Sequence, residues 1–337
     1  MAKKKNSAAR SNNPAKRAAA AKPTSGNGTA RVERARTPRT SFGRWFSAAR
    51  PQTLGLAVAP VAFGTGVASA NQAVNYLYAA LALVVALGLQ IGVNYANDYS
   101  DGIRGTDAVR VGPFRLTASG FVKAKSVRNA AFSAFGIAAA TGLALVVLSK
   151  LWIFIALGAL AIVAAWLYTG GKRPYGYAGY GELIAFFFFG PVAVYGTTWS
   201  QNPLTFSGQW IALAALGGSL GLGFFAAAVL LVNNLRDIET DTAVGKRTLA
   251  VLLGVIPTKI LFTILVLAAY AVAVPYLLFY PVTELAFFTL LIMLPVLAIV
   301  WSYRSPRELI TALKLTTASA TLYGLLLAWG MVYGKLL

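Results

Sequence analysis

Cysteine and histidine are both absent from this chain of 337 residues. Without thiols there is no disulfide scaffold, and without either residue type there is no zinc site built on sulfur or imidazole ligands. The same absences exclude Ser-His-Asp and Cys-His nucleophilic catalysis. Any metal must therefore be bound through oxygen atoms, which makes Mg²⁺, Ca²⁺ and Mn²⁺ the candidates.

Charged residues are scarce as well, and acidic residues are the scarcest. Charged side chains make up 12% of the sequence, against about 25% in typical soluble domains. Only 10 residues are acidic, whereas 30 are Lys or Arg, and 57% of the chain is hydrophobic. Because the apolar residues come in long uncharged runs, the sequence argues against a soluble single domain.

The basic residues are concentrated at the N-terminus. Residues 1–50 hold 13 of the 30 Lys and Arg residues and a single acid, Glu33. This stretch is rich in Ala, Pro, Ser and Gly and has no apolar period, which predicts a disordered tail over residues 1–40 and one domain over 41–337. A basic tail can bind nucleic acid or anionic lipid. The pattern favours a cytoplasmic tail that obeys the positive-inside rule, without a nucleic-acid partner.

Long apolar stretches fill the rest of the chain. A helix needs about 20 apolar residues to cross a bilayer. Nine stretches qualify, at about residues 51–70, 76–97, 129–149, 151–169, 183–200, 210–233, 258–279, 283–302 and 309–333. The sequence therefore predicts an all-α integral membrane protein with nine transmembrane helices.

The Lys and Arg residues orient these spans. With nine spans, 28 of the 30 basic residues fall on the side of the N-terminus, and only Lys150 and Lys335 fall on the other. Loops rich in Lys and Arg face the cytoplasm. We therefore predict a cytoplasmic N-terminus and an external C-terminus.

The few acids are clustered where two spans end on this cytoplasmic side. Six of the ten lie in two short segments, namely Asp98, Asp101 and Asp107 after the second span and Asp237, Glu239 and Asp241 after the sixth. Offsets of three and four residues place Asn94, Asn97, Asp98 and Asp101 on one helix face. Carboxylates at a helix C-terminus oppose the helix dipole, so a cation is expected to compensate them.

The second cluster repeats the arrangement. Asn233, Asp237 and Asp241 are spaced four residues apart and form another polar stripe. Two such stripes on the same membrane face are able to hold one or two Mg²⁺ ions together with water and phosphate oxygens. Solvation of helix ends is the alternative, and it stays open for single members such as Asp98 or Glu239.

Cations follow both acidic clusters on the same predicted face. They are Arg104, Arg110, Arg115, Lys123 and Lys125 after the first cluster, Lys172 and Arg173 after the fourth span, and Lys246 and Arg247 after the second cluster. Metal-binding carboxylates combined with Lys and Arg form a site for a diphosphate. The Gly-rich residues 217–223 lie within a span, so they are interpreted as close helix packing.

The two motifs together resemble a known family. An Asn-xxx-Asp motif at Asn97 and Asp101 and an Asp-xxx-Asp motif at Asp237 and Asp241, in a nine-span chain, are similar to those of the UbiA superfamily of intramembrane aromatic prenyltransferases. The resemblance covers about residues 44–334. Many members continue the first motif with another Asp, but here Gly105 stands at that position. This departure, with residues 97–107, 112–120 and 168–177, resembles the menaquinone branch of the superfamily.

The resemblance implies an activity and a cofactor. It implies transfer of a polyprenyl group from an all-trans polyprenyl diphosphate to 1,4-dihydroxy-2-naphthoate, giving demethylmenaquinol with loss of CO₂ and diphosphate. It also implies that one or two Mg²⁺ ions bridge the diphosphate and are bound by Asn97, Asp101, Asp237 and Asp241. The implied location is a bacterial inner membrane, with membrane lipids around the protein and the active site near the cytoplasmic face.

Roles for individual residues follow from the same resemblance. The catalytic residues expected are Asp101, Arg115, Lys123, Asp237 and Asp241, and the substrate-binding residues expected are Asn94, Asn97, Asp98, Arg104, Asp107, Arg110, Lys172, Asn233, Lys246 and Arg247. Arg115 or Lys172 is expected to bind the acceptor carboxylate. Two alternatives remain open at this point: a superfamily member that uses 4-hydroxybenzoate, haem or a phosphoribosyl acceptor, and a membrane transporter.

Overall fold

The computed structural model describes residues 38, 40–106, 114–201 and 209–334. The chain divides into two units, Met1–Arg39 and Thr40–Leu337, and every element named below belongs to the second. The predicted disordered tail falls almost entirely outside the described residues, so it stays a prediction. Within the described residues the secondary structure is helical, without a strand.

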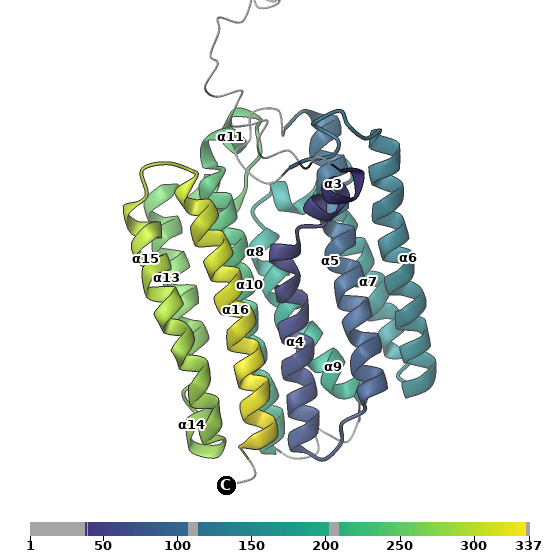
Figure 1. The fold of residues 1–337 in the computed structure, drawn as a ribbon, viewed down its shortest axis with the longest axis vertical. Coiled ribbons are helices and arrows are strands. Elements are labelled where there is room, and N and C mark those ends of the chain that lie inside the picture. The colour runs from purple at the N-terminus through teal and green to yellow at the C-terminus, as the bar shows by residue number, and fades with distance from the viewer. Residues whose placement is uncertain (1–37, 39, 107–113, 202–208, 335–337) are drawn as a thin grey trace, which may run out of the picture. The chain divides into compact units, whose positions relative to one another are not determined.

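The helices of Thr40–Leu337 lie side by side along one direction (Figure 1). The first half contains α3 (Ser41–Ala48), α4 (Pro51–Ala70), α5 (Tyr76–Arg104), α6 (Ala124–Ser149), α7 (Ile153–Leu167), η1 (Tyr175–Tyr177), α8 (Gly181–Phe187), η2 (Phe188–Val192) and α9 (Ala193–Gln201). The second half contains α10 (Gln209–Arg236), α11 (Ile238–Ala243), α12 (Leu249–Leu253), α13 (Val255–Ala271), α14 (Tyr276–Phe279), η4 (Pro281–Thr289), α15 (Leu290–Ser302) and α16 (Glu308–Tyr333).

The predicted spans are found at the expected places. Eight helical segments of the described chain are long and apolar enough to cross a membrane. The remaining span, predicted at 151–169, is the shorter apolar helix α7. The prediction of an all-helical membrane protein is therefore confirmed, with one span shorter than the sequence indicated.

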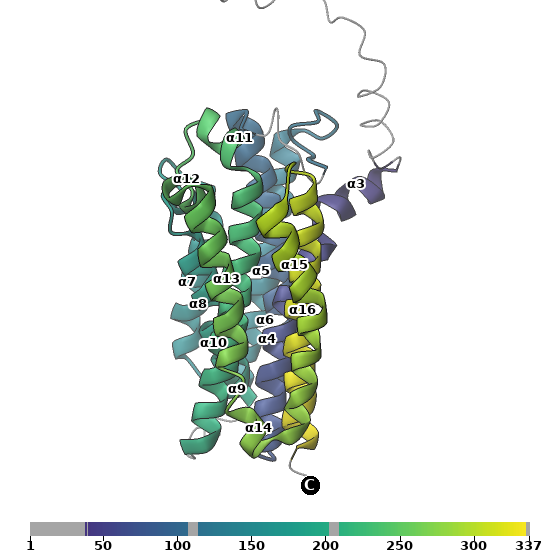
Figure 2. The same cartoon turned by 90° about the vertical axis from the view of Figure 1, so that its left-hand side faces the viewer.

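Two groups of helices flank a central pair. Figures 1 and 2 show α13, α15 and α16 on one side of α4 and α10, and α5, α6 and α7 on the other. The largest buried cluster joins α4, α10, α13, α15 and α16, and the fully buried Tyr323 donates a hydrogen bond of 2.7 Å to the Ala269 carbonyl within it. The second group lines much of the cavity described below.

Close packing accounts for the Gly-rich residues of α10. A Cβ built on Gly218 would lie 2.1 Å from the Phe63 ring, and one on Gly223 would lie 2.8 Å from the Phe186 side chain and backbone. These distances are too short for any side chain, so only glycine permits the contacts. The interpretation of residues 217–223 as a packing stretch is confirmed.

The fifth predicted span is interrupted where a proline removes a backbone donor. Gly181–Gln201 runs as α8, then the π-helical turn η2, then α9, and Pro191 lies within the turn. Because proline lacks the N–H that an α-helix requires, the helix widens locally instead of continuing regularly. The turn places Phe188 and Val192 in the wall of the cavity beside α10.

Candidate active site

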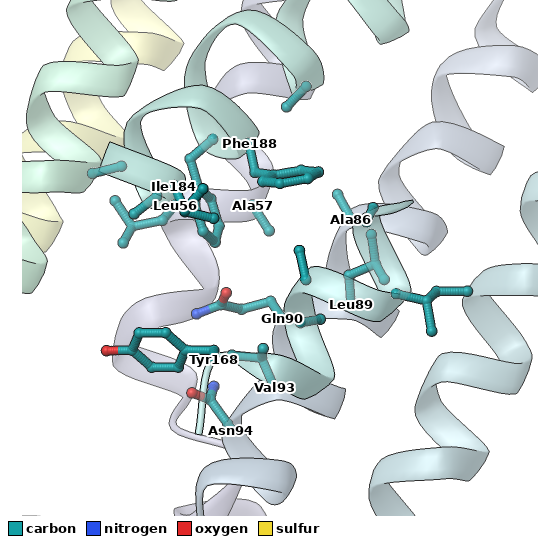
Figure 3. A pocket seen from close by; sticks show the side chains of 18 of the residues that line it. Leu56, Ala57, Ala86, Leu89, Gln90, Val93, Asn94, Tyr168, Ile184 and Phe188 are labelled. Carbon is teal, nitrogen blue, oxygen red and sulfur yellow. The ribbon is translucent and has the colours of Figure 1, made fainter. Parts of the chain in front are cut away.

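A cavity of about 570 Å³ lies among α4, α5, α6, α7, α8, α9 and α10. Its wall is polar at one end, where α5 ends and α11 begins, and apolar along the rest of its length. Figure 3 shows this change of character, with Asn94, Gln90 and Tyr168 near one another and Leu56, Ala57 and Phe188 further along. The arrangement suits a ligand with a charged head and a long apolar chain.

Asp101 is the centre of the polar end. Its side chain is only 3% exposed and receives a hydrogen bond from the Tyr177 hydroxyl. Lys246 Nζ donates to Asp101 Oδ1 over 3.2 Å, and Arg115 Nη2 lies 3.8 Å from Asp101 Oδ2. Two cations, Lys246 and Arg115, therefore compensate the negative charge at this helix end, where one was expected.

Lys246 connects the two acidic clusters. Its ammonium lies 3.2 Å from Asp101 Oδ1 and 3.7 Å from Asp241 Oδ1, and it stands 4.7 Å from the centre of the Tyr177 ring. The turn after α11 aims it inward, because the Lys246 amide donates to the Asp241 carbonyl. The structure thus brings Asp101 together with Asp241 and Lys246, which come much later in the sequence, as the two-stripe hypothesis requires.

Asp98 positions the segment that carries Arg115. Its two carboxylate oxygens accept hydrogen bonds of 2.8 Å from the backbone amides of Leu116 and Thr117. Gly102 permits the close approach, since a Cβ there would lie 2.4 Å from Thr117. Asp98 does not line the cavity, so its contribution to the site is to hold Arg115 in place.

The amide side chains of α5 are anchored to neighbouring elements. Asn97 Oδ1 accepts a hydrogen bond of 2.7 Å from Thr169, and Asn94 Nδ2 donates over 2.9 Å to the Ala49 carbonyl. Gln90 Nε2 donates to Thr53, while its buried Oε1 has no hydrogen-bond partner among the described residues. All three amides line the cavity, and their anchoring fixes which atoms face it.

The second stripe is only partly directed at the cavity. Asn233 and Asp241 line it, whereas Asp237 does not. Asp237 forms a two-pronged pair with Arg236, with an Nε–Oδ1 distance of 2.7 Å and an Nη2–Oδ2 distance of 2.6 Å. Arg236 also donates to Asn233 Oδ1 over 2.9 Å. Both Asp237 oxygens thus pair with Arg236, and the role of Asp237 in holding a metal stays a prediction.

Several predicted cations lie away from the cavity. Lys123, Lys172 and Arg247 are exposed and do not line it. Arg104 donates to the carbonyl of Thr169 and, over 2.6 Å, to that of Gly171, so it fixes the turn after α7. Asp107 and Arg110 lie outside the described residues. Of the predicted cations that the structure describes, Arg115 and Lys246 line the cavity.

Sequence reasoning did not assign a role to three residues at or beside the site. Tyr177 lines the cavity and contacts Asp101 and Lys246, and Thr248 lines it with a buried hydroxyl that has no partner in the described part of the chain. Glu182 does not line the cavity, but its buried carboxylate accepts a hydrogen bond of 2.8 Å from Asn234, which does. The sequence could have indicated Glu182, because a carboxylate within an apolar span is costly and is usually functional. The sequence around Tyr177 and Thr248 does not mark these two residues in any comparable way.

The oxygen donors at the polar end fit a divalent cation. Asp101, Asp241 and Asn97 line one wall, and an ammonium already bridges the two carboxylates. Within the described residues no three acids form a metal-binding group. Mg²⁺ commonly uses one or two carboxylates and completes its shell with water and substrate phosphate oxygens. The donor set therefore fits Mg²⁺ held jointly with a diphosphate.

Tyr177 provides a prediction about this cluster. Burial raises the pKa of its phenol and the charge of Asp101 raises it further, so the group stays protonated and donates to Asp101. We expect Tyr177→Phe to lower kcat/KM about tenfold, because a hydrogen bond to a charged group contributes about 1.5–3 kcal/mol. The control is Tyr180→Phe, whose side chain is exposed. Equal kinetics for the two variants would contradict the assignment.

The chain is similar to proteins of one family. The UbiA prenyltransferase family matches residues 57–309. A Mycobacterium tuberculosis protein named 1,4-dihydroxy-2-naphthoate octaprenyltransferase is 45% identical over 296 residues, which are 88% of this chain and 99% of that protein. A Haemophilus influenzae protein of the same name is 37% identical over 306 residues, 86% of this chain and 96% of that one. A solved UbiA homolog from Archaeoglobus fulgidus bound to DMAPP and Mg²⁺ has a TM-score of 0.56 at 16% identity, covering 86% of this chain and 99% of that chain.

Proposed function

Because this chain belongs to the UbiA prenyltransferase family and is a multi-pass membrane protein, we propose that it transfers a polyprenyl group to 1,4-dihydroxy-2-naphthoate. The donor is a polyprenyl diphosphate, and the products are demethylmenaquinol, CO₂ and diphosphate. One observation carries the proposal: Asp101, Asp241, Lys246 and Arg115 line the same cavity as a long apolar wall. The names of the relatives support the choice of acceptor.

The charges of the site explain why a divalent cation is needed. The charged side chains among the described residues that line the cavity are Asp101, Asp241, Arg50, Arg115 and Lys246. Their net charge is only +1, less than the negative charge of a diphosphate, and Asp237 is paired with Arg236. A diphosphate bound there without a counterion would place uncompensated negative charge in a buried site, which is costly. Asn97, Asp101 and Asp241 would hold Mg²⁺, which supplies positive charge to the leaving diphosphate.

The reaction balances without a cysteine or histidine. The C–O bond to the diphosphate breaks and leaves an allylic cation, and Lys246 stabilises the charge that develops on the departing oxygens. The ring carbon that bears the carboxylate attacks the cation and forms the new C–C bond. The carboxylate then leaves as CO₂, and its electron pair restores the aromatic ring. No base is needed at that carbon, which agrees with the composition of the site.

Arg115 is the residue we assign to the acceptor carboxylate. It is buried and lines the cavity next to Asp101, whereas Lys172, the other candidate, is exposed and does not line the cavity. A guanidinium pairs with a carboxylate through two parallel hydrogen bonds, which fixes the acceptor's orientation. The hydrogen bonds from the Leu116 and Thr117 amides to Asp98 keep Arg115 in this position.

The predicted topology indicates on which side of the membrane the site lies. The polar end of the cavity lies at the ends of α5 and α11, opposite the end where α16 finishes (Figure 1). By the distribution of Lys and Arg this face is cytoplasmic. The diphosphate and the naphthoate therefore enter from the cytoplasm, while the prenyl chain stays among the helices.

The function is tested with the purified protein in detergent. We expect octaprenyl diphosphate, 1,4-dihydroxy-2-naphthoate and Mg²⁺ to give a prenylated naphthoquinone and CO₂, measured by mass spectrometry. EDTA should stop the reaction and added Mg²⁺ should restore it. Product from 4-hydroxybenzoate and none from the naphthoate would overturn the acceptor assignment. Release of no diphosphate with any acceptor would overturn the transferase itself.

A further inference from the structure

Helix α3, Ser41–Ala48, carries two large aromatic side chains on its outer surface. Phe42 is 78% exposed and Phe46 is 55% exposed, and their rings stack with the centroids 6.1 Å apart. The helix is not one of the candidate spans, so the lipid around the spans does not by itself account for this pair. A contiguous exposed apolar surface outside the spans indicates an interaction site.

A different face of α3 is packed onto the polar end of the bundle. The Trp45 ring meets the Tyr95 ring edge-on at 5.5 Å, and the Tyr95 hydroxyl donates a hydrogen bond of 3.2 Å to the Trp45 carbonyl. Ala48, three residues after Trp45, is buried in the same cluster as Leu116. Because residues at offsets of three and four share a helix face, α3 is fixed to the bundle by one face, and the stacked pair occupies another.

The helix α3 lies where the chain enters the membrane. It ends at Ala48, and α4, the first candidate span, begins at Pro51. Arg50, between the two helices, has a left-handed backbone with a φ of 55°, which turns the chain into a new direction. Figure 2 shows α3 projecting from the side of the bundle. This places α3 at the membrane surface, on the side that the Lys and Arg residues predict to be cytoplasmic.

The sequence that leads into α3 is strongly basic. Residues 1–39 hold 11 Lys and Arg residues and a single acid, Glu33. Within the helix, the Arg44 guanidinium stands 4.0 Å from the centre of the Phe121 ring, and Phe121 is itself exposed. The anionic lipids of a cytoplasmic leaflet attract such basic segments. Charge complementarity therefore selects an anionic lipid surface as the partner of the exposed aromatic pair.

We propose that α3 is an interfacial helix that inserts Phe42 and Phe46 among the anionic lipids of the leaflet, and that this docking steadies the segment that carries Arg115. The coupling follows from the shared cluster of Ala48 and Leu116, because Leu116 directly follows Arg115 in the chain. The docking is independent of the proposed function. The coupling rests on it, since it takes Arg115 as the partner of the acceptor carboxylate.

The absence of cysteine makes the docking directly measurable. Phe46→Cys attaches a spin label on the face of the aromatic pair, and Ser47→Cys attaches one at the next residue, on a different face. Both proteins are reconstituted in nanodiscs of phosphatidylcholine, with or without phosphatidylglycerol. In the anionic discs we expect the label of Phe46→Cys to collide with oxygen more often than with a water-soluble nickel complex. The label of Ser47→Cys should show the reverse order.

Three results would overturn the docking. Equal collision with the nickel complex at both labels in anionic discs would show that the aromatic face does not enter the lipid. Protection of the Phe46→Cys label from both oxygen and nickel would show that protein covers this face, as in a contact between two copies of the chain. Identical accessibility in neutral and anionic discs would refute the selection by charge.

Steady-state kinetics in the same discs tests the coupling. We expect the KM for 1,4-dihydroxy-2-naphthoate to be about fivefold lower in anionic discs than in neutral ones, the effect of about one basic residue at an anionic surface on the docked fraction. Phe46→Ser should remove most of this dependence. The control is Phe288→Ser, whose side chain is 63% exposed on η4, and it should keep the dependence.

The two measurements separate this inference from the reaction. Equal lipid dependence of the KM in Phe46→Ser and Phe288→Ser would refute the coupling, whatever the labels show. If the wild type transferred nothing to the naphthoate in either disc, the proposed function would fail, while the collision rates of the two labels would still decide whether α3 docks on the lipid.

Discussion

Replacement of Asp101 by asparagine should lower kcat/KM by about 10²–10³-fold while the protein still inserts and folds. Lys246, Arg115 and the Tyr177 hydroxyl all converge on this carboxylate. Loss of its charge removes an oxygen ligand for the cation that accompanies the diphosphate and leaves the Lys246 ammonium with Asp241 as its acidic partner. Removing one electrostatic contact at a transition state typically costs this much. The measurement is steady-state kinetics with a fixed donor.

The control for Asp101→Asn is Glu239→Gln. Glu239 belongs to the second acidic cluster but is exposed on α11, so the substitution makes the same change in charge outside the cavity. Thermal unfolding in detergent shows whether Asp101→Asn remains folded. Activity close to wild type in a folded Asp101→Asn protein would remove Asp101 from the metal and diphosphate site.

Lys246→Met should raise the KM for the donor and lower kcat, with a combined loss of about 10²-fold. The ammonium is the group that joins the two acidic clusters, and it is 6% exposed. Methionine keeps much of the length of the side chain, so the change is mainly electrostatic. Without the ammonium, Asp101 and Asp241 repel each other and the leaving diphosphate loses a charged donor.

Arg247, the next residue, provides the control for Lys246→Met. Arg247 follows Lys246 directly, but its side chain is exposed and its contact in the site is a backbone hydrogen bond to the Tyr177 carbonyl. Arg247→Met removes the same charge one residue away and should retain most of the activity. If both variants lost activity equally, the general positive charge of this face would be responsible, and the specific position of Lys246 would not matter.

The membrane fold was predictable because the bilayer imposes a simple rule on the sequence. Apolar stretches of sufficient length predicted the number of spans, and the bias of Lys and Arg to one side predicts their direction. The rule fails locally at α7, which runs only from Ile153 to Leu167. Hydropathy counts apolar residues, and it does not register that Thr169 and Gly171 leave the helix to accept hydrogen bonds from, or donate them to, Asn97 and Arg104 of α5.

The site was predictable where helical spacing puts residues on one face, and less so elsewhere. The period of α5 correctly grouped Asn94, Asn97 and Asp101. The same period included Asp98, whose backbone contacts depend on a loop that no spacing describes. In the second stripe the adjacent Arg236 pairs with Asp237, and a pattern of acids does not reveal that competition. Contacts made by loops, such as that of Tyr177, need the fold.

The length of α5 determines where the chemistry takes place relative to the lipid. Its 29 residues extend about 43 Å, whereas the hydrocarbon layer is about 30 Å thick. We expect Tyr76, which is exposed at the start of α5, to lie at one membrane interface. Asp101 would then lie about 37 Å along the helix axis from it, beyond the hydrocarbon layer and among the headgroups. In the proposed reaction the two anionic groups, the diphosphate and the carboxylate, meet at this position. The product has lost both charges and partitions into the hydrocarbon layer, so the loss of charge itself favours its release into the bilayer.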